Sequence, residues 1–345
     1  MSKAFEGSGA FSGVAPSLVD ILKTGNRPDK FRALKALAAI GPDAKSAVPT
    51  LIQFLDVQHK LQSESADVLA AIGPAAAAAV PILIQIMLRT CATYDYAHYS
   101  AAHALGRIGD TSAIPALIEA AQDRDDQGPG WRAICALANF GTKAQAASPV
   151  LAKLVLNSDV EWKGNIISAL SNIGPASGPG CDAIIDWIEN CTDLEERSES
   201  VYALYQILFT GGKPDSRAIS IFIQQLQVLD GKCAYWSALA LGHLKERQAL
   251  PELVKLALST GPEEARIEAI RSLGFIGDGS ELVITAIRKS LSDQSESIRC
   301  IAAFACGWLG PAAKGLNELL LQQASNGLLN ASWLKIDDII KKINA

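Results

Sequence analysis

The chain has 345 residues, of which 49% are hydrophobic and 6% aromatic, so it can bury a large core of small and aliphatic side chains. Its net charge of -5 excludes a general attraction to nucleic-acid phosphates or anionic lipid, which need clustered Lys and Arg. The seven cysteines are scattered and form no C-x-x-C pair, which argues against a disulfide framework or a zinc site and favours reduced thiols in a cytoplasm.

The N-terminal stretch MSKAFEGSGAFSGVAPS has no apolar run followed by a small-residue cleavage site, so it predicts no signal peptide. We expect residues 1–29 to form a cap on the array that follows. The most apolar run, 75–88, contains Pro81 and Gln85 and is too short for a comfortable membrane span. It predicts a helix buried between neighbouring helices.

A repeated pattern fills residues 30–322. Its anchor is a glycine, replaced once by lysine, that recurs every 32 to 37 residues, at Gly41, Gly73, Gly109, Gly141, Gly174, about Gly211, Lys245, Gly277 and Gly310. Apolar residues stand four and seven positions before each anchor, which places them on one face of a helix. The glycine then ends that helix, because it tolerates the left-handed conformation that follows a last turn.

A proline recurs six to eight residues after most anchors, at Pro49, Pro81, Pro115, Pro149 and Pro251. Proline suits the first turn of a helix, where its missing N–H would have had no partner, so it marks the start of a second helix. Each unit is therefore a helix, a short turn and a second helix, and such hairpins must stack to bury their apolar faces.

The segment AAHALGRIGDTSAIPALIEAAQD, residues 101–123, resembles the HEAT-like repeats of the phycobilin-lyase type, with the core A-x-x-A-L-G-x-I-G-D followed by A-[IV]-P-x-L. The resemblance implies an all-α, right-handed solenoid of about nine helical hairpins over residues 30–322, with a C-terminal capping helix in 323–345. The fifth and sixth units lack the proline that starts the second helix. The Gly- and Pro-rich stretches there predict an irregular break near 174–215, with a hinge as a hypothesis.

The stretch CATYDYAHYS, residues 91–100, gathers three of the six tyrosines. Tyr94 and Tyr96 fall in a connecting loop that is longer than its neighbours, and loop tyrosines offer large contact area at low entropy cost, so we predict that they bind a partner. The alternative is that they only cover the loop. His98 and His103 are five residues apart, so they face different directions on a helix and predict no metal site.

The second helices are expected to line the concave face of the solenoid. Polar residues of mixed sign recur there four positions after each proline or its equivalent, at Gln53, Gln85, Glu119, Lys153, Asp186, Gln224, Lys255 and Arg288. This row has neither aromatic stacking platforms nor runs of Arg and Lys, so it favours a protein partner over nucleic acid. The alternative is a hydrated inner face.

The loops between units carry acidic residues along one edge. They are Asp123, Asp125, Asp126, Asp159, Glu161, Asp193, Glu195, Glu196, Glu199, Glu263, Glu264, Asp293 and Glu296. Many are expected to cap helix starts or to oppose the helix dipole. Together they predict an acidic rim that attracts a basic partner, with Glu195 and Glu196 as binding residues.

No P-loop, H-E-x-x-H, G-x-S-x-G or nucleotide-binding glycine motif is present, and none of the four histidines precedes a glutamate. The sequence thus favours a non-enzymatic scaffold or adaptor that binds protein, without cofactor or metal, in a bacterial cytoplasm; an inhibitor of immunity type also fits. The resemblance alone implies an alternative, a subunit of a bilin lyase or isomerase acting on phycobiliproteins. A nucleic-acid repair enzyme is disfavoured by the charge.

Overall fold

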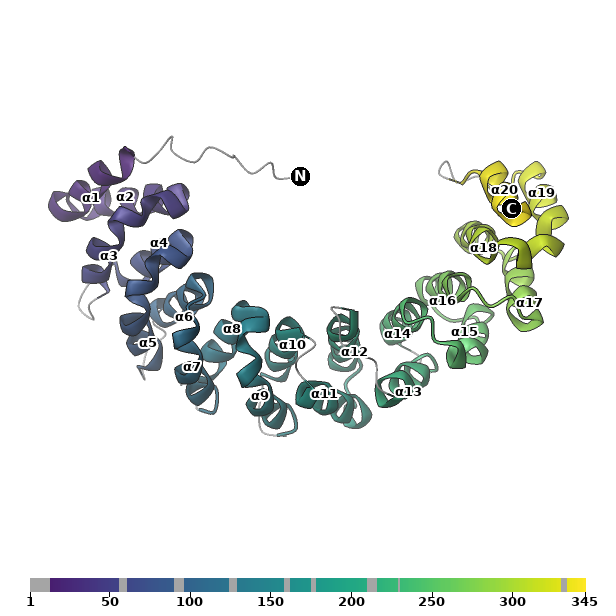
Figure 1. Cartoon of the computed structure of the whole chain (residues 1–345), viewed down its shortest axis with the longest axis horizontal. Helices are drawn as coiled ribbons and strands as arrows, with labels where there is room; N and C mark the ends of the chain where they lie inside the picture. Colours follow the sequence, from purple (N-terminus) through teal and green to yellow (C-terminus); the bar gives the residue numbers. More distant parts are fainter. Residues whose placement is uncertain are drawn as a thin grey trace. The chain divides into compact units, whose positions relative to one another are not determined.

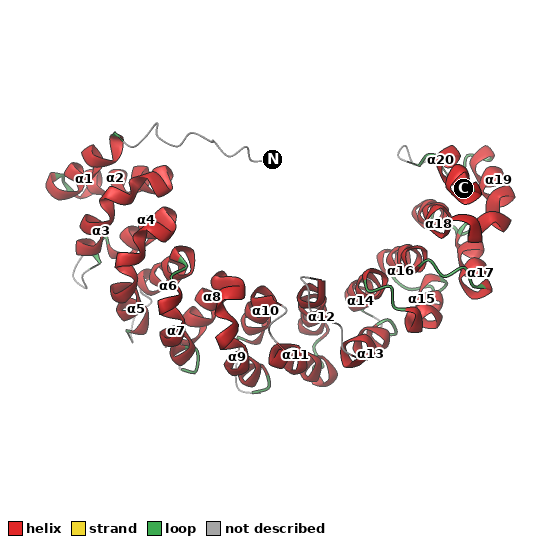
Figure 2. Ribbon diagram, viewed as in Figure 1, coloured by secondary structure: helices red, strands yellow, loops and turns green. Residues whose placement is uncertain are grey.

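The computed structural model describes residues 13–55, 61–89, 96–123, 129–157, 162–174, 178–209, 216–228, 230–329 and 334–345, and within these ranges it is built of helices, turns and loops without strands (Figure 2). The chain divides into two compact units, Met1–Ala183 and Ile184–Ala345. The division falls inside the predicted irregular stretch 174–215, and the hinge itself stays a prediction.

Unit 1 consists of two layers of helices. The first helices of its hairpins are α2 (Arg27–Ile40), α4 (Gln62–Ile72), α6 (Tyr96–Ile108), α8 (Gly130–Phe140) and α10 (Lys163–Ile173). The other layer contains α1 (Val14–Thr24), α3 (Val48–Phe54), α5 (Val80–Leu88), α7 (Ile114–Ala120) and α9 (Ser148–Val155), and α11 (Gly178–Asn190) crosses into unit 2. Short 3₁₀ turns, such as Gly41–Ala47, connect the helices of a hairpin.

Unit 2 has the same two layers. Its first helices are α12 (Leu194–Phe209), α14 (Gly231–His243), α16 (Glu263–Ile276) and α18 (Glu296–Leu309), and the terminal helix α20 (Ile336–Asn344) packs against α18. The second helices are α13 (Ser216–Gln225), α15 (Leu250–Ala257), α17 (Glu281–Ser290) and α19 (Asn317–Ser325). Helix α20 lies in the segment predicted to form the C-terminal cap.

The repeat anchors have positive φ angles, but the predicted left-handed conformation is found at Gly277, with φ 71° and ψ 24°, and not at most of the others. Gly41, Gly73, Gly141, Gly174 and Gly310 combine positive φ with ψ between -130° and -153°, a region that is open essentially to glycine alone. Positive φ angles occur at Gly41, Gly73, Gly109, Gly141, Gly174, Gly277 and Gly310, and Lys245, which replaces the glycine, has φ 53°. Proline stands in the first turn of α3, α5, α7, α9 and α15. The residues four positions before the anchors, such as Leu37, Leu105 and Leu273, are fully buried. The predicted hairpins and their apolar stripes are confirmed.

The first helices, not the second, lie on the inner side of the curve within each unit (Figure 1). The reason is close packing between consecutive first helices, which contact each other more extensively than consecutive second helices do. Small residues permit this approach: a Cβ on Gly106 would stand 2.5 Å from that of Asn139, and one on Gly274 would stand 2.8 Å from the Trp308 ring. The prediction that the second helices line the concave side is therefore wrong.

The run Gln62–Leu88 is, among the described residues, the one helical run long and apolar enough to cross a membrane by length and composition, with a mean hydropathy of 2.0. It is not one straight helix, because it turns at Gly73, with φ 71° and ψ -138°. Residues of α5, including Leu83 and Met87, are fully buried against the neighbouring repeats, as predicted for a core helix.

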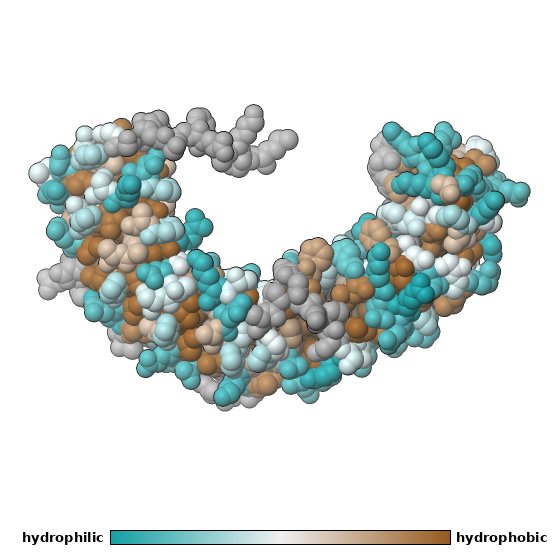
Figure 3. Space-filling model, viewed as in Figure 1, coloured by the Kyte–Doolittle hydropathy of each residue, from teal (hydrophilic) through white to brown (hydrophobic). Residues whose placement is uncertain are grey.

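Elsewhere on both units, apolar residues (brown) reach the surface between hydrophilic ones (teal) (Figure 3).

Candidate functional site

The polar row predicted on the second helices lies on the outer layer of the units. Its members are Gln53 on α3, Gln85 on α5, Glu119 on α7, Lys153 on α9, Asp186 on α11, Gln224 on α13, Lys255 on α15 and Arg288 on α17. Three of them already have partners within the chain: Asp186 pairs with Arg217 at 2.5 Å, Lys255 with Glu252 at 2.5 Å and Arg288 with Glu281 at 3.8 Å. The structure does not bring this row to the concave side, for the packing reason given above.

Helix caps and inter-repeat contacts occupy part of the predicted acidic rim. The carboxylate of Asp193 accepts hydrogen bonds from the N–H groups of Glu195 and Glu196 at 2.9 Å, which starts α12. Glu195 and Glu196 themselves are exposed. Tyr94, Asp125, Asp126, Asp159 and Glu161 lie outside the described residues, and Tyr96 begins α6.

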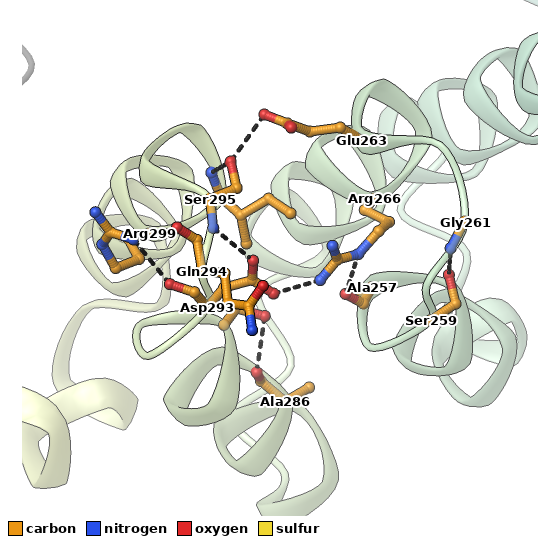
Figure 4. Close-up of polar contacts among 12 residues, drawn as sticks. Ala257, Ser259, Gly261, Glu263, Arg266, Ala286, Asp293, Gln294, Ser295 and Arg299 are labelled. Atoms are coloured by element: carbon orange, nitrogen blue, oxygen red, sulfur yellow. Dashed lines mark hydrogen bonds and ion pairs between the residues drawn. The ribbon is translucent and has the colours of Figure 1, made fainter.

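Asp293 and Arg266 form the centre of the largest polar network that Figure 4 shows. The Arg266 guanidinium donates to the Asp293 carboxylate and, at 3.3 Å, to the carbonyl of Ala257. Asp293 accepts from the N–H of Ser295 at 2.9 Å, and the Ser295 hydroxyl bonds to Glu263 at 2.8 Å. Asp293 and Glu263 therefore join consecutive repeats, a structural use that the sequence analysis did not predict, whereas the predicted capping of a helix start is seen at Asp193.

A row of aromatic side chains crosses the inner layer of unit 2 from α12 to α18. This aromatic row comprises Tyr202, Tyr205, Phe209, Trp236, His243, Phe275 and Trp308. The ring centroids of Tyr202 and Trp236 are 4.4 Å apart, and those of Phe275 and Trp308 are 4.5 Å apart. The side chains are half-buried or exposed, up to 61% for Phe209, so the row is a surface rather than a core.

The register of the repeat contains this row, although sequence reasoning missed it. Two positions before the anchors, unit 2 has Phe209, His243, Phe275 and Trp308, whereas unit 1 has Ala39, Ala71, Arg107, Asn139 and Asn172. The row lies on the first helices, whereas the binding face was predicted on the second helices. The signal would have been found by comparing the same position on the first helices of both halves of the chain.

A pocket of about 590 Å³ opens at one end of the aromatic row, between the N-terminal turns of α12 and α14. Its lining includes the aromatic residues Tyr202, Tyr235 and Trp236 and the acidic residues Glu199, Asp230 and Glu264. A smaller pocket of about 280 Å³ lies toward the C-terminal ends of the same helices, beside Tyr205, Phe209 and His243. The first of these two is called the aromatic-acidic pocket below.

Glu268 on α16 is fully buried. One of its oxygens accepts from Arg271 at 2.6 Å, while Oε1 has no hydrogen-bond partner. Burial raises the pKa of Glu268, against the opposing effect of Arg271. Burial also raises the pKa of Tyr205 and Tyr235, and the nearby Glu268 charge contributes in both cases. The inner layer thus holds a buried acidic group close to its aromatic side chains.

Family comparison agrees with this architecture. The profile of the HEAT repeats family matches residues 80–171 and 219–306, which together are more than half of the chain. The chain belongs to the HEAT repeat family. A comparison with curated proteins gives no match to this HEAT-repeat chain.

Solved structures with the same fold include importin β, with 13% identity and a TM-score of 0.64, where the match covers 96% of the HEAT-repeat chain and 52% of importin β. A Kap121p mutant has 14% identity and a TM-score of 0.60 over 97% of this chain and 42% of that one. The HEAT-repeat chain thus spans about half the length of these proteins or less. The complex of CpcE and CpcF of phycocyanin lyase from Nostoc sp. PCC7120 has 20% identity and a TM-score of 0.37, over 70% of this chain and 92% of that one.

The described residues offer few groups for metal or thiol chemistry. In the described part of the chain, no group of three His, Cys, Asp or Glu residues is placed to hold a metal ion. Burial raises the pKa of the Cys233 and Cys306 thiols to about 12, so neither is a nucleophile near neutral pH. Two surface features of unit 2 stand out, namely the aromatic row and the aromatic-acidic pocket at its end.

Proposed function

We propose that this HEAT-repeat chain is a non-enzymatic scaffold that binds a protein partner on the inner layer of unit 2. The observation that carries the proposal is the aromatic row, which continues over four consecutive first helices and has no counterpart at the same register in unit 1. Exposed Tyr and Trp side chains provide most of the binding energy at many protein interfaces, because they bury large areas at low entropy cost.

A protein partner is favoured over nucleic acid by the charges beside the row. Aromatic platforms that stack bases need Lys and Arg to follow the phosphate backbone. The aromatic-acidic pocket instead has Glu199, Asp230 and Glu264 in its lining, against one lysine, Lys232. A phosphate backbone would be repelled there, whereas a basic protein segment would be attracted.

We also propose that the chain works in a bacterial cytoplasm, where buried reduced thiols such as Cys233 and Cys306 persist. We do not propose a bilin lyase subunit, since only the repeat resemblance implies one. Absorption spectra of the purified chain with a linear tetrapyrrole would show a shift if this choice were mistaken.

Site-specific photo-crosslinking in the native host tests the proposed surface. A photoreactive phenylalanine analogue replaces Phe209 or Phe275 in the aromatic row, and in matched control variants it replaces Asn139 or Asn172, which share their register in unit 1. We expect one protein to crosslink at the two row positions and not at the controls, and purified partner and chain to form a complex. Equal crosslinking at all four positions, or no protein adduct at the row, would contradict the proposal.

A further inference from the structure

We infer that the aromatic-acidic pocket receives an arginine side chain of the partner protein. This inference rests on the proposed function, because it names the chemistry by which the inner layer of unit 2 selects a partner. The pocket is about 590 Å³ in volume, within the usual size range of ligand sites, and two different kinds of side chain converge in it.

Aromatic rings form one wall of the pocket. The ring centroids of Trp236 and Tyr202 are 4.4 Å apart, with an interplanar angle of 46°, and those of Trp236 and Tyr235 are 4.9 Å apart, with an angle of 82°. The three rings therefore face different directions. Tyr202 is 37% exposed, so its ring is accessible to a ligand. A guanidinium group stacks on such faces by cation–π attraction, and it does so more often than an ammonium group.

Carboxylates lie at the mouth of the same pocket. Glu199 on α12 and Glu264 on α16 are both exposed, and they come from helices on either side of α14. Asp230 accepts from the N–H groups of Lys232 at 3.3 Å and Cys233 at 3.1 Å. The first turn of α14 therefore offers these two donors to its own aspartate and not to an anionic ligand, so the pocket favours a cation.

The geometry of arginine fits these groups better than that of lysine. Its planar guanidinium can lie on a ring face while its fork of N–H groups reaches a carboxylate such as Glu199 or Glu264. Lysine offers a compact, strongly hydrated charge, which gains less from the flat aromatic faces. We therefore expect the pocket to distinguish the two basic side chains.

Peptide titration of the full chain tests the inference. Three fluorescein-labelled, blocked peptides alternate glycine with arginine, lysine or citrulline, and binding is followed by fluorescence anisotropy at low and at physiological salt. Citrulline keeps the planar shape of arginine and removes its charge. We expect the citrulline peptide to bind at least about tenfold more weakly than the arginine peptide, and the lysine peptide to lie between them.

Matched variants locate the binding. We expect Tyr202→Leu to weaken the arginine peptide about 3- to 20-fold, and Glu199→Gln combined with Glu264→Gln to weaken it similarly and to flatten its salt dependence. The controls are Tyr99→Leu, where the tyrosine is 39% exposed on a first helix of unit 1, and Glu296→Gln at the start of α18. Circular dichroism of each variant verifies that it is folded.

Equal binding of the arginine and citrulline peptides would overturn the inference, as would equal weakening by the control substitutions. These outcomes are separate from those of the crosslinking experiment. If crosslinks form at Phe209 and Phe275 while the arginine peptide fails to bind, the scaffold proposal stands and the arginine site is wrong. If no partner crosslinks at the row, the scaffold proposal itself fails.

Discussion

Replacing Asp293 with asparagine tests whether the acidic loop residues hold consecutive repeats together. Asp293 and Arg266 are only 19% and 15% exposed, and their ion pair joins α16 to the loop before α18 (Figure 4). Asparagine preserves an oxygen for the Ser295 N–H but removes the charge that faces the guanidinium. Alanine at the same position removes both.

The expected cost follows from these contacts. A hydrogen bond to a charged group contributes about 1.5–3 kcal/mol, and a neutral one about 0.5–1.5 kcal/mol, so Asp293→Asn should lower the free energy of unfolding by about 1–2 kcal/mol. Asp293→Ala also leaves the Ser295 N–H without its acceptor, at an additional cost of about 1 kcal/mol. Glu296→Gln, on an exposed residue of the same region, should change stability by less than about 0.5 kcal/mol.

The assay is native-state hydrogen exchange of the amides in α16 and α18, because a long repeat array need not unfold in one transition. In a chain that already has Arg266→Ala, Asp293→Asn should lower the free energy of unfolding much less, because the guanidinium that pairs with Asp293 is gone. The reasoning is refuted if Asp293→Asn leaves the exchange of both helices unchanged, or if its cost is the same with and without Arg266.

The same pair predicts a pH dependence. Burial by itself would raise the pKa of Asp293, but hydrogen bonds from Ser295 and Arg266 and the charges of Arg266 and Arg299 outweigh it and lower the pKa. A carboxyl group whose pKa is lower in the folded state binds fewer protons there, so its contribution is present above its unfolded pKa and is lost as pH falls. Between about pH 5 and 3, the advantage of wild type over Asp293→Asn should therefore shrink.

Three further outcomes are expected. Burial raises the pKa of Glu268 in the folded chain, so the folded state binds a proton there more tightly than the unfolded state does. Stability should therefore fall as pH rises above the ordinary pKa of a glutamate, and Glu268→Gln should flatten that fall when urea unfolding is measured at several pH values. Gly274→Ala should destabilise by about 1–3 kcal/mol in the same assay, because the new Cβ meets the α18 indole at 2.8 Å, whereas Gly307→Ala, with nothing nearer than 3.6 Å, should be neutral or stabilising. Cys233 and Cys306, with pKa values near 12, should not react with a thiol reagent at pH 8 until urea unfolds the chain, and rapid reaction in the native state would contradict their burial.

The fold could be read from the sequence because its determinants are local. Each glycine anchor, each proline in a first turn and each apolar stripe acts within one hairpin, so the hairpins could be assigned without knowing their neighbours. The lysine at 245, with its φ of 53°, takes the place of a glycine without disturbing the register.

The placement of the binding surface could not be read in the same way. Which layer lies inside the curve depends on contacts between repeats, such as that of Gly274 with Trp308, and one hairpin does not encode that comparison. The pocket likewise combines Glu199, Tyr202, Trp236 and Glu264 from three hairpins. Two of its acidic residues, Glu199 and Glu264, belong to the predicted rim. Its aromatic half was not predicted, because it lies on the first helices and the second helices were expected to form the concave side.

The contacts between first helices have a consequence for how the chain folds. Each helix packs chiefly on helices one or two places away in the chain, as α6 does on α4 and α5. Native contacts therefore close short loops, which is the arrangement associated with fast folding. During synthesis, each hairpin finds its packing partner already made, so a new repeat can fold as soon as it emerges without waiting for the repeats that follow it.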